Sequence, residues 1–194
     1  MPRSYQSFTP DVRPPRLRHS VMELGRVVME MGSTALLGPL LKTLPKGDGH
    51  PVLVLPGFMA SDRSTKPMRR LFDDLGYKSY GWGLGRNVRF NEDREREMSD
   101  LVEQIYAENG QKLSIVGWSL GGVIARETAR LNSEAVREII TMGTPLIGGP
   151  KYTAVGQLYA LREGLDLDEF ELEVHDRNAV GLSQPLTVIF SKSD

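Results

Sequence analysis

The sequence predicts an α/β fold in which a mostly parallel sheet carries helices on both faces. From residue 50 onward, short apolar runs bounded by Gly or Pro alternate with longer segments whose apolar residues recur every three or four positions. Strands that alternate with helices of this length indicate parallel pairing through right-handed crossovers. The 194 residues, 40% of them hydrophobic and 25% charged, suffice for one globular domain with a sizeable core.

Five strands are expected in this alternation. The second contains polar residues that suit the edge of a sheet, whereas the fifth is apolar on both faces, which is typical of an interior strand. The expected strands are "PVLVLPG" (51–57), "YKSYGWG" (77–83), "KLSIVG" (112–117), "VREIITMG" (136–143) and "LTVIF" (186–190).

Three helices are expected between these strands, and each carries its own boundary signals. The first has a Ser/Thr cap, Pro67 in its first turn and a terminating Gly76. The second opens on a capping Asn91 with acids in its first turn and closes at Asn109-Gly110. The expected helices are "STKPMRRLFDDLG" (64–76), "NEDREREMSDLVEQIYAENG" (91–110) and "GGVIARETARL" (121–131).

The chain outside this alternation predicts three further segments. A Pro- and Arg-rich stretch without apolar periodicity indicates a disordered or extended arm, and apolar residues at helical spacing from Leu24 to Met31 indicate a helix. We interpret that helix as packing on its own domain, with a lid or a membrane-surface helix as the alternative. The predicted divisions are the arm (1–18), the N-terminal helical segment (19–49) and the α/β domain (50–194), which includes an acidic cap at about 150–184.

Composition excludes several classes of function. A formal net charge of −1 gives no basic excess for nucleic acid, and the absence of cysteine excludes disulfides and a thiolate nucleophile. No cluster of His and acidic residues suggests a metal, and no cofactor is expected. The N-terminus lacks the apolar run of a secretory signal, and the uncharged stretch at 31–41 has 11 residues where a membrane span needs about 20. We expect a cytoplasmic protein that acts on a small molecule.

"LSIVGWSLGGVIARE" (113–127) contains a Gly-x-Ser-x-Gly motif between the third strand and the helix that follows it. Gly117 and Gly121 leave room for a turn so tight that Ser119 adopts a strained conformation with its Oγ pushed clear. The start of the helix points main-chain N–H groups and the positive end of its dipole at this position. Together with Trp118, these residues predict a nucleophile turn, in which the N–H of Leu120 holds a developing oxyanion. The simpler interpretation is a strand-to-helix turn with a capping serine.

"HPVLVLPGF", "GWSLGG" and "ITMGTPLIGG" together resemble the α/β-hydrolase superfamily, specifically its bacterial esterase- and lipase-like members, over residues 48–194. Ser at position 119, where dehalogenase-type members have Asp, argues against a dehalogenase-type member. The resemblance implies a second oxyanion donor in the loop after the first strand, at the N–H of Phe58. Many lipases have His-Gly where this chain has Pro56-Gly57. The resemblance also implies a catalytic acid after "LTVIF", which is Asp194.

The base for this serine is harder to identify, because none of the three histidines is well placed. His19 lies at the boundary between the predicted arm and the N-terminal helical segment, and His50 precedes the first strand, roughly 15–20 Å from the site at the opposite end of the sheet. His175 lies in the cap and would give the order Ser, His, Asp, whereas the family order is Ser, Asp, His. We therefore expect the catalytic His and a strand covering "LTVIF" to lie beyond residue 194, which makes the given chain a fragment of weak or no activity.

The predicted function is hydrolysis of a carboxylic ester, either a small acyl ester or a lipid, through an acyl-enzyme on Ser119. Acyl transfer and lactone or amide hydrolysis on the same fold remain alternatives, as does a non-catalytic binding module. Peripheral membrane contact through the N-terminal helix and the oligomeric state are left open. Asp62 and Asp74 are interpreted as solvated surface carboxylates. The residues expected to line an apolar substrate pocket are Met59, Trp82, Leu84 and Leu146.

Overall fold

The computed structural model describes residues 43–88, 91–144 and 181–190. All of them belong to one compact unit, formed by Met31–Leu146 and Val180–Asp194. The predicted arm, most of the N-terminal helical segment and the cap up to residue 180 lie outside the described residues, as do Asp194 and the segment around Leu146. Among the described helices, none is long and apolar enough to cross a membrane.

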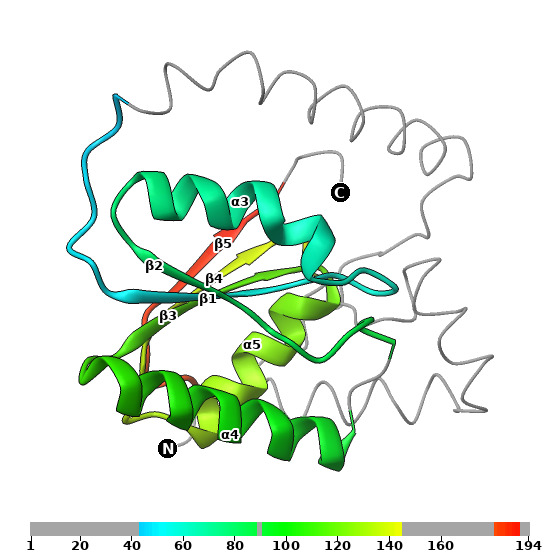
Figure 1. Ribbon diagram of the computed structural model, residues 1–194. Helices are drawn as coiled ribbons and strands as arrows, with labels where there is room; N and C mark the ends of the chain where they lie inside the picture. The colour runs from blue at the N-terminus through cyan, green and yellow to red at the C-terminus, as the bar shows by residue number, and fades with distance from the viewer. Residues whose placement is uncertain (1–42, 89–90, 145–180, 191–194) are drawn as a thin grey trace, which may run out of the picture. The chain divides into compact units, whose positions relative to one another are not determined.

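The described strands form one parallel sheet in the order β2-β1-β3-β4-β5, which confirms the predicted parallel sheet (Figure 1). The polar second strand lies at an edge, as expected. Chain order reverses around β1, because β2 lies on one side of it and β3 on the other. The strands are β1 (Pro51–Leu55), β2 (Lys78–Gly81), β3 (Leu113–Trp118), β4 (Val136–Met142) and β5 (Leu186–Ile189).

The apolar β5, for which the sequence predicts an interior place, is an outer strand of the described sheet. Within the described residues it pairs with β4 alone, and Ile189 and Phe190 are 53% and 72% exposed. An apolar pattern predicts that a strand will be buried, but it does not predict which segment of the chain covers it.

Helix α3 (Asp62–Asp74) lies on one face of the sheet, and α4 (Glu92–Asn109) and α5 (Leu120–Leu131) lie on the other, as predicted (Figure 1). The α4 boundaries follow the predicted signals, because Asn91 Oδ1 accepts from the Arg94 N–H at 3.1 Å and Gly110 ends the helix with φ 65°. Helix α3 begins two residues earlier than predicted, which moves Pro67 out of the first turn.

Side chains that alternate along β1 build the cores on the two faces. Val52 and Val54 are buried beneath Phe72 of α3, whereas Leu53 and Leu55 belong to a larger cluster with α4 and α5. Each such side chain contributes about 1.5–3 kcal/mol when fully buried. The two cores fix the carboxyl ends of β1 and β3, and the loops that follow these two strands form the candidate site.

Candidate active site

Ser119 occupies the turn between β3 and α5 with φ 52° and ψ −121°. A positive φ is unfavourable for a residue with a side chain, and such strain persists only where the surroundings impose it. The partly exposed Ser119 side chain makes no capping hydrogen bond to α5. The simpler interpretation of a capping serine is therefore not supported by the geometry.

Glycines make this turn possible because main-chain atoms occupy the space that a Cβ would need. A Cβ on Gly117 would lie 2.4 Å from the carbonyl oxygen of Gly121. A Cβ on Gly121 would lie 2.5 Å from the carbonyl oxygen of Leu55, at the end of β1. The start of α5 thus approaches the end of β1 more closely than any residue with a side chain allows.

The end of β4 supports the turn from the other side. The Ser119 N–H donates to the carbonyl oxygen of Met142 at 2.9 Å, and the Thr144 hydroxyl donates to the carbonyl oxygen of Ser119 at 3.1 Å. Sequence reasoning missed Thr144, although it quoted the "GTPLIGG" segment that contains it. Its place in the chain could have indicated the contact, because the segment follows β4, which is the strand next to β3.

The loop after β1, residues 56–60, lies against the nucleophile turn. A Cβ on Gly57 would lie 3.4 Å from Ser119 Cβ and 3.3 Å from Trp118 Cε3. The Ala60 N–H donates to the carbonyl oxygen of Gly57 at 3.1 Å, so the loop folds back tightly around Phe58. We call residues 56–60 the oxyanion loop, after the role that the sequence predicts for the Phe58 N–H.

Both parts of the site follow the carboxyl ends of neighbouring parallel strands, β1 and β3, at the point where the strand order reverses. Ligands of open parallel sheets bind at such switch points. The start of α5 adds main-chain N–H groups and a partial positive charge at the same place. This arrangement suits a reaction that develops negative charge on an oxygen beside Ser119.

The predicted pocket residues have different surroundings. Met59 is 46% exposed, and Trp118 of the nucleophile turn is 42% exposed, so both offer apolar surface beside Ser119. Leu84 is partly buried and packs against the larger core cluster. Trp82, predicted to line the pocket, has no exposed surface and belongs to the hydrophobic core.

Asp62 is not the solvated carboxylate that the sequence suggested. Its two carboxylate oxygens accept from the main-chain N–H groups of Trp82 and Gly83, each at 2.9 Å. It therefore fixes the start of the glycine-rich segment after β2, residues 82–87. Sequence reasoning missed this because the partners are some twenty residues away in the chain.

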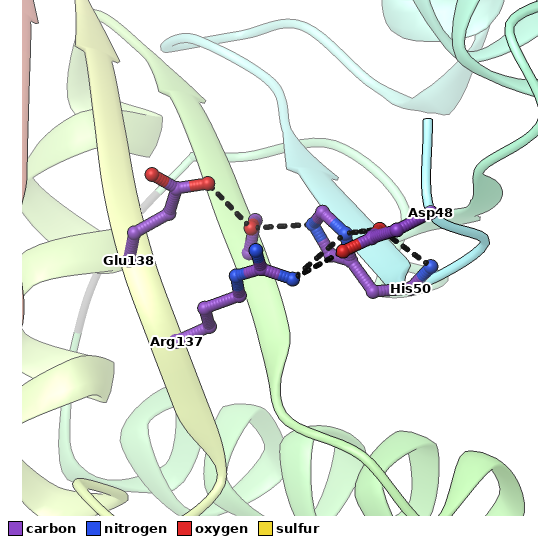
Figure 2. A network of polar contacts seen from close by, with 5 residues as sticks. Asp48, His50, Arg137 and Glu138 are labelled. Carbon is purple, nitrogen blue, oxygen red and sulfur yellow. Dashed lines mark hydrogen bonds and ion pairs between the residues drawn. The ribbon is translucent and has the colours of Figure 1, made fainter. Parts of the chain in front are cut away.

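His50 belongs to a polar network at the amino ends of β1, β3 and β4 (Figure 2). Its Nδ1 pairs with the Asp48 carboxylate, and its Nε2 lies 2.8 Å from Ser114 Oγ. Arg137 donates to Asp48 at 2.7 Å, and Ser114 donates to Glu138 at 3.0 Å. The groups resemble a Ser-His-Asp triad, but Ser114 is buried and belongs to β3, whose opposite end leads into the nucleophile turn.

This network predicts a pH dependence of stability. Hydrogen bonds from Arg137 and then His50 hold the pKa of Asp48 well below its usual range. A lowered pKa in the folded state adds stability that is complete above the unfolded pKa, about 4, and is lost as the pH falls towards the folded pKa. Asp48→Asn should therefore lower the thermal unfolding midpoint at pH 7, and the deficit should shrink steadily below about pH 4.

Circular dichroism melts between pH 2 and pH 7 measure this deficit. Asp100→Asn, on the exposed surface of α4, is the matched control and should leave the midpoint close to that of the wild type. A deficit for Asp48→Asn that stays constant down to pH 2 would contradict the network's electrostatic role.

Within the described ranges, no group of three or more His, Asp or Glu side chains is placed to hold a metal ion.

The family model of lecithin:cholesterol acyltransferase matches residues 75–169, just under half of the chain. Among curated proteins, no sequence match to this chain is found.

Several solved structures resemble this one at low sequence identity. The mature lipase BlEst2 of Bacillus licheniformis matches with 16% identity and a TM-score of 0.51, over 75% of this chain and 67% of its own. A monoacylglycerol lipase of Paleococcus ferrophilus matches with 14% identity and a TM-score of 0.52, over 75% and 74%. MGS-MChE2, an α/β-hydrolase from a lagoon-sediment metagenome of Mar Chica, Morocco, matches with 19% identity and a TM-score of 0.51, over 78% and 72%. These matches confirm the fold that the motifs predicted.

Proposed function

We propose that this chain, which has the α/β-hydrolase fold, hydrolyses a carboxylic ester through an acyl-enzyme on Ser119. The observation that carries the proposal is the strained main chain of Ser119, φ 52° and ψ −121°, in a turn that places the residue at the start of α5 without using its side chain as a cap. Such strain is concentrated at functional sites, where it presents a reacting group.

In the proposed reaction, Ser119 Oγ attacks the ester carbonyl carbon while a general base accepts the hydroxyl proton. The N–H groups of Leu120 and Phe58 hold the oxyanion of the tetrahedral intermediate, assisted by the positive end of α5. The alcohol then leaves with the proton held by the base. Water, activated by the same base, attacks the acyl-enzyme and releases the carboxylic acid.

The proposal places the base outside the described residues. His50 is the histidine within them, and both of its ring nitrogens have partners at the amino ends of the strands. We keep Asp194 as the proposed acid, because it follows the strand β5 as the family pattern requires. His175 remains the alternative base.

An uncharged acyl ester is the substrate class that the surroundings of Ser119 favour. Met59 and Trp118 offer exposed apolar surface there, and two of the similar structures carry the names of lipases. On p-nitrophenyl esters of increasing acyl length, we expect kcat/KM to increase beyond the acetate, because each buried methylene contributes about 0.8 kcal/mol. Absence of turnover on every ester by the full-length protein would contradict the proposal.

Acyl transfer is the second candidate, favoured by the match of residues 75–169 to the acyltransferase family model. A hydrolase and a transferase share the acyl-enzyme and differ in the nucleophile that resolves it. Adding an alcohol acceptor during ester turnover separates them. A hydrolase would continue to release mainly free acid, whereas a transferase would form mainly the new ester.

A further inference from the structure

Asn87 connects the glycine-rich segment after β2 to the oxyanion loop. Its side-chain amide Nδ2 donates to the carbonyl oxygen of Pro56 at 2.7 Å. Its own carbonyl oxygen accepts from the Met59 N–H at 2.7 Å, and its N–H donates to the carbonyl oxygen of Ala60 at 2.8 Å. Asn87 is completely buried, so three hydrogen bonds shielded from water hold both ends of the oxyanion loop.

The oxyanion loop needs such support because its conformation is unfavourable by itself. Met59 has φ 59°, which is an unfavourable conformation for a residue with a side chain. The bonds from Asn87 fall on either side of Phe58, at Pro56 and Met59. They therefore fix the orientation of the peptide group that carries the proposed oxyanion donor.

The segment that carries Asn87 is itself rigidly held. The Asp62 carboxylate accepts from the main chain at Trp82, and the Trp82 indole N–H donates to the carbonyl oxygen of Gly85 at 2.9 Å. The Arg94 guanidinium lies 5.0 Å from the centroid of the Trp82 ring. The positive charge is attracted to the face of the ring at this distance. Asn87 thus presents its amide from a fixed position.

We propose that Asn87 is a positioning residue for the oxyanion hole. Its side chain holds the carbonyl of Pro56, so that the oxyanion loop presents the Phe58 N–H towards Ser119. It acts through the loop without touching the substrate. This inference rests on the proposed function and adds to it the residue that sets the geometry of the hole.

Asn87→Ala removes the bond to Pro56 and retains the two main-chain bonds. We expect kcat to fall about ten-fold, with KM changed less than about two-fold, because misplacing an oxyanion donor weakens binding of the transition state more than binding of the substrate. The rate at which a fluorophosphonate phosphonylates Ser119 should fall in parallel. Asn87 Oδ1 has no hydrogen-bond partner among the described residues. The substitution to alanine therefore also removes a buried unsatisfied acceptor, which limits the loss of stability.

Asn132→Ala is the matched control. Asn132 is also buried, and its side-chain amide donates to the carbonyl oxygen of Thr128 at 2.9 Å and to Ser99 Oγ at 3.0 Å, at the far end of α5 from Ser119. Its loss should lower the unfolding midpoint without changing kcat per folded molecule. Circular dichroism at the assay temperature supplies the folded fraction for each variant.

Asn87→Asp separates positioning from packing. The substitution keeps the size of the side chain but replaces the donating amide with a carboxylate oxygen that faces the carbonyl of Pro56. We expect labelling and kcat at neutral pH at least as slow as in Asn87→Ala, whereas a packing role requires near wild-type rates. A labelling rate equal to the wild type in Asn87→Ala would overturn the inference and leave the proposed function intact. A wild type that neither labels nor hydrolyses esters would overturn the proposed function and the inference with it.

Discussion

Ser119→Ala should lower kcat/KM for esters by at least about 10⁴-fold while leaving the fold intact. The activity depends on the Oγ as nucleophile, and no other group in the proposed mechanism can replace it. The stability of the fold should change little, because the Ser119 side chain makes no capping hydrogen bond to α5. Alanine also pays about the same energetic cost as serine for the positive φ at this position. Ester hydrolysis measured beside the circular dichroism spectrum and unfolding midpoint tests both parts.

His50→Ala is the control for this result. It removes the imidazole that links Asp48 to Ser114, so the unfolding midpoint should fall. Turnover per folded molecule should stay at the wild-type level, because the network lies at the amino ends of the strands. Turnover retained by Ser119→Ala would make that serine structural. Loss of turnover in a fully folded His50→Ala variant would place the reaction at the amino ends of the strands, away from Ser119, and would contradict the account.

Gly121→Ala should lower the free energy of unfolding by at least about 2 kcal/mol. The added Cβ would lie 2.5 Å and 2.7 Å from the carbonyl oxygens of Leu55 and Pro56, and main chain cannot move aside as a flexible side chain can. Relief of this clash requires α5 and the oxyanion loop to separate. The variant should therefore also lose ester turnover in its remaining folded fraction. Urea denaturation gives the change in stability.

Gly181→Ala supplies the comparison for this substitution. Among the described residues, a Cβ at Gly181 meets no atom within 4 Å, so the stability of Gly181→Ala should change by less than about 0.5 kcal/mol. If Gly121→Ala unfolded at the same urea concentration as Gly181→Ala, the close approach of α5 to β1 would not be a feature of the molecule in solution.

Local signals in the sequence predicted most of the fold. The limits of α4 follow from Asn91 and Gly110, because capping and a left-handed glycine are decided by neighbouring residues. The turn at Ser119 could likewise be predicted, since the two glycines that it needs lie two positions away on either side. In both cases the physical cause and the sequence pattern lie in the same short segment.

Contacts between distant segments could not be predicted in this way. In the sequence, Asn87 is only the last residue of a glycine-rich segment. In the structure, its side-chain amide donates to the carbonyl oxygen of Pro56 at 2.7 Å, 31 residues earlier in the chain. Trp82 looked like a pocket residue, but the turn held by Asp62 buries it in the core. The order of the strands decides these contacts, and hydrophobic periodicity does not contain that order.

Labelling the full-length wild-type protein with a fluorophosphonate, followed by peptide mapping, tests the central claim most directly. The fluoride leaves as the serine oxygen bonds to phosphorus, so an activated serine gains one stable phosphonyl group. We predict one such group per chain, on the peptide that contains Ser119, and none in Ser119→Ala. Labelling at Ser114 would instead place the reactive serine in the His50 network. A wild type without any label would favour a binding module over an enzyme.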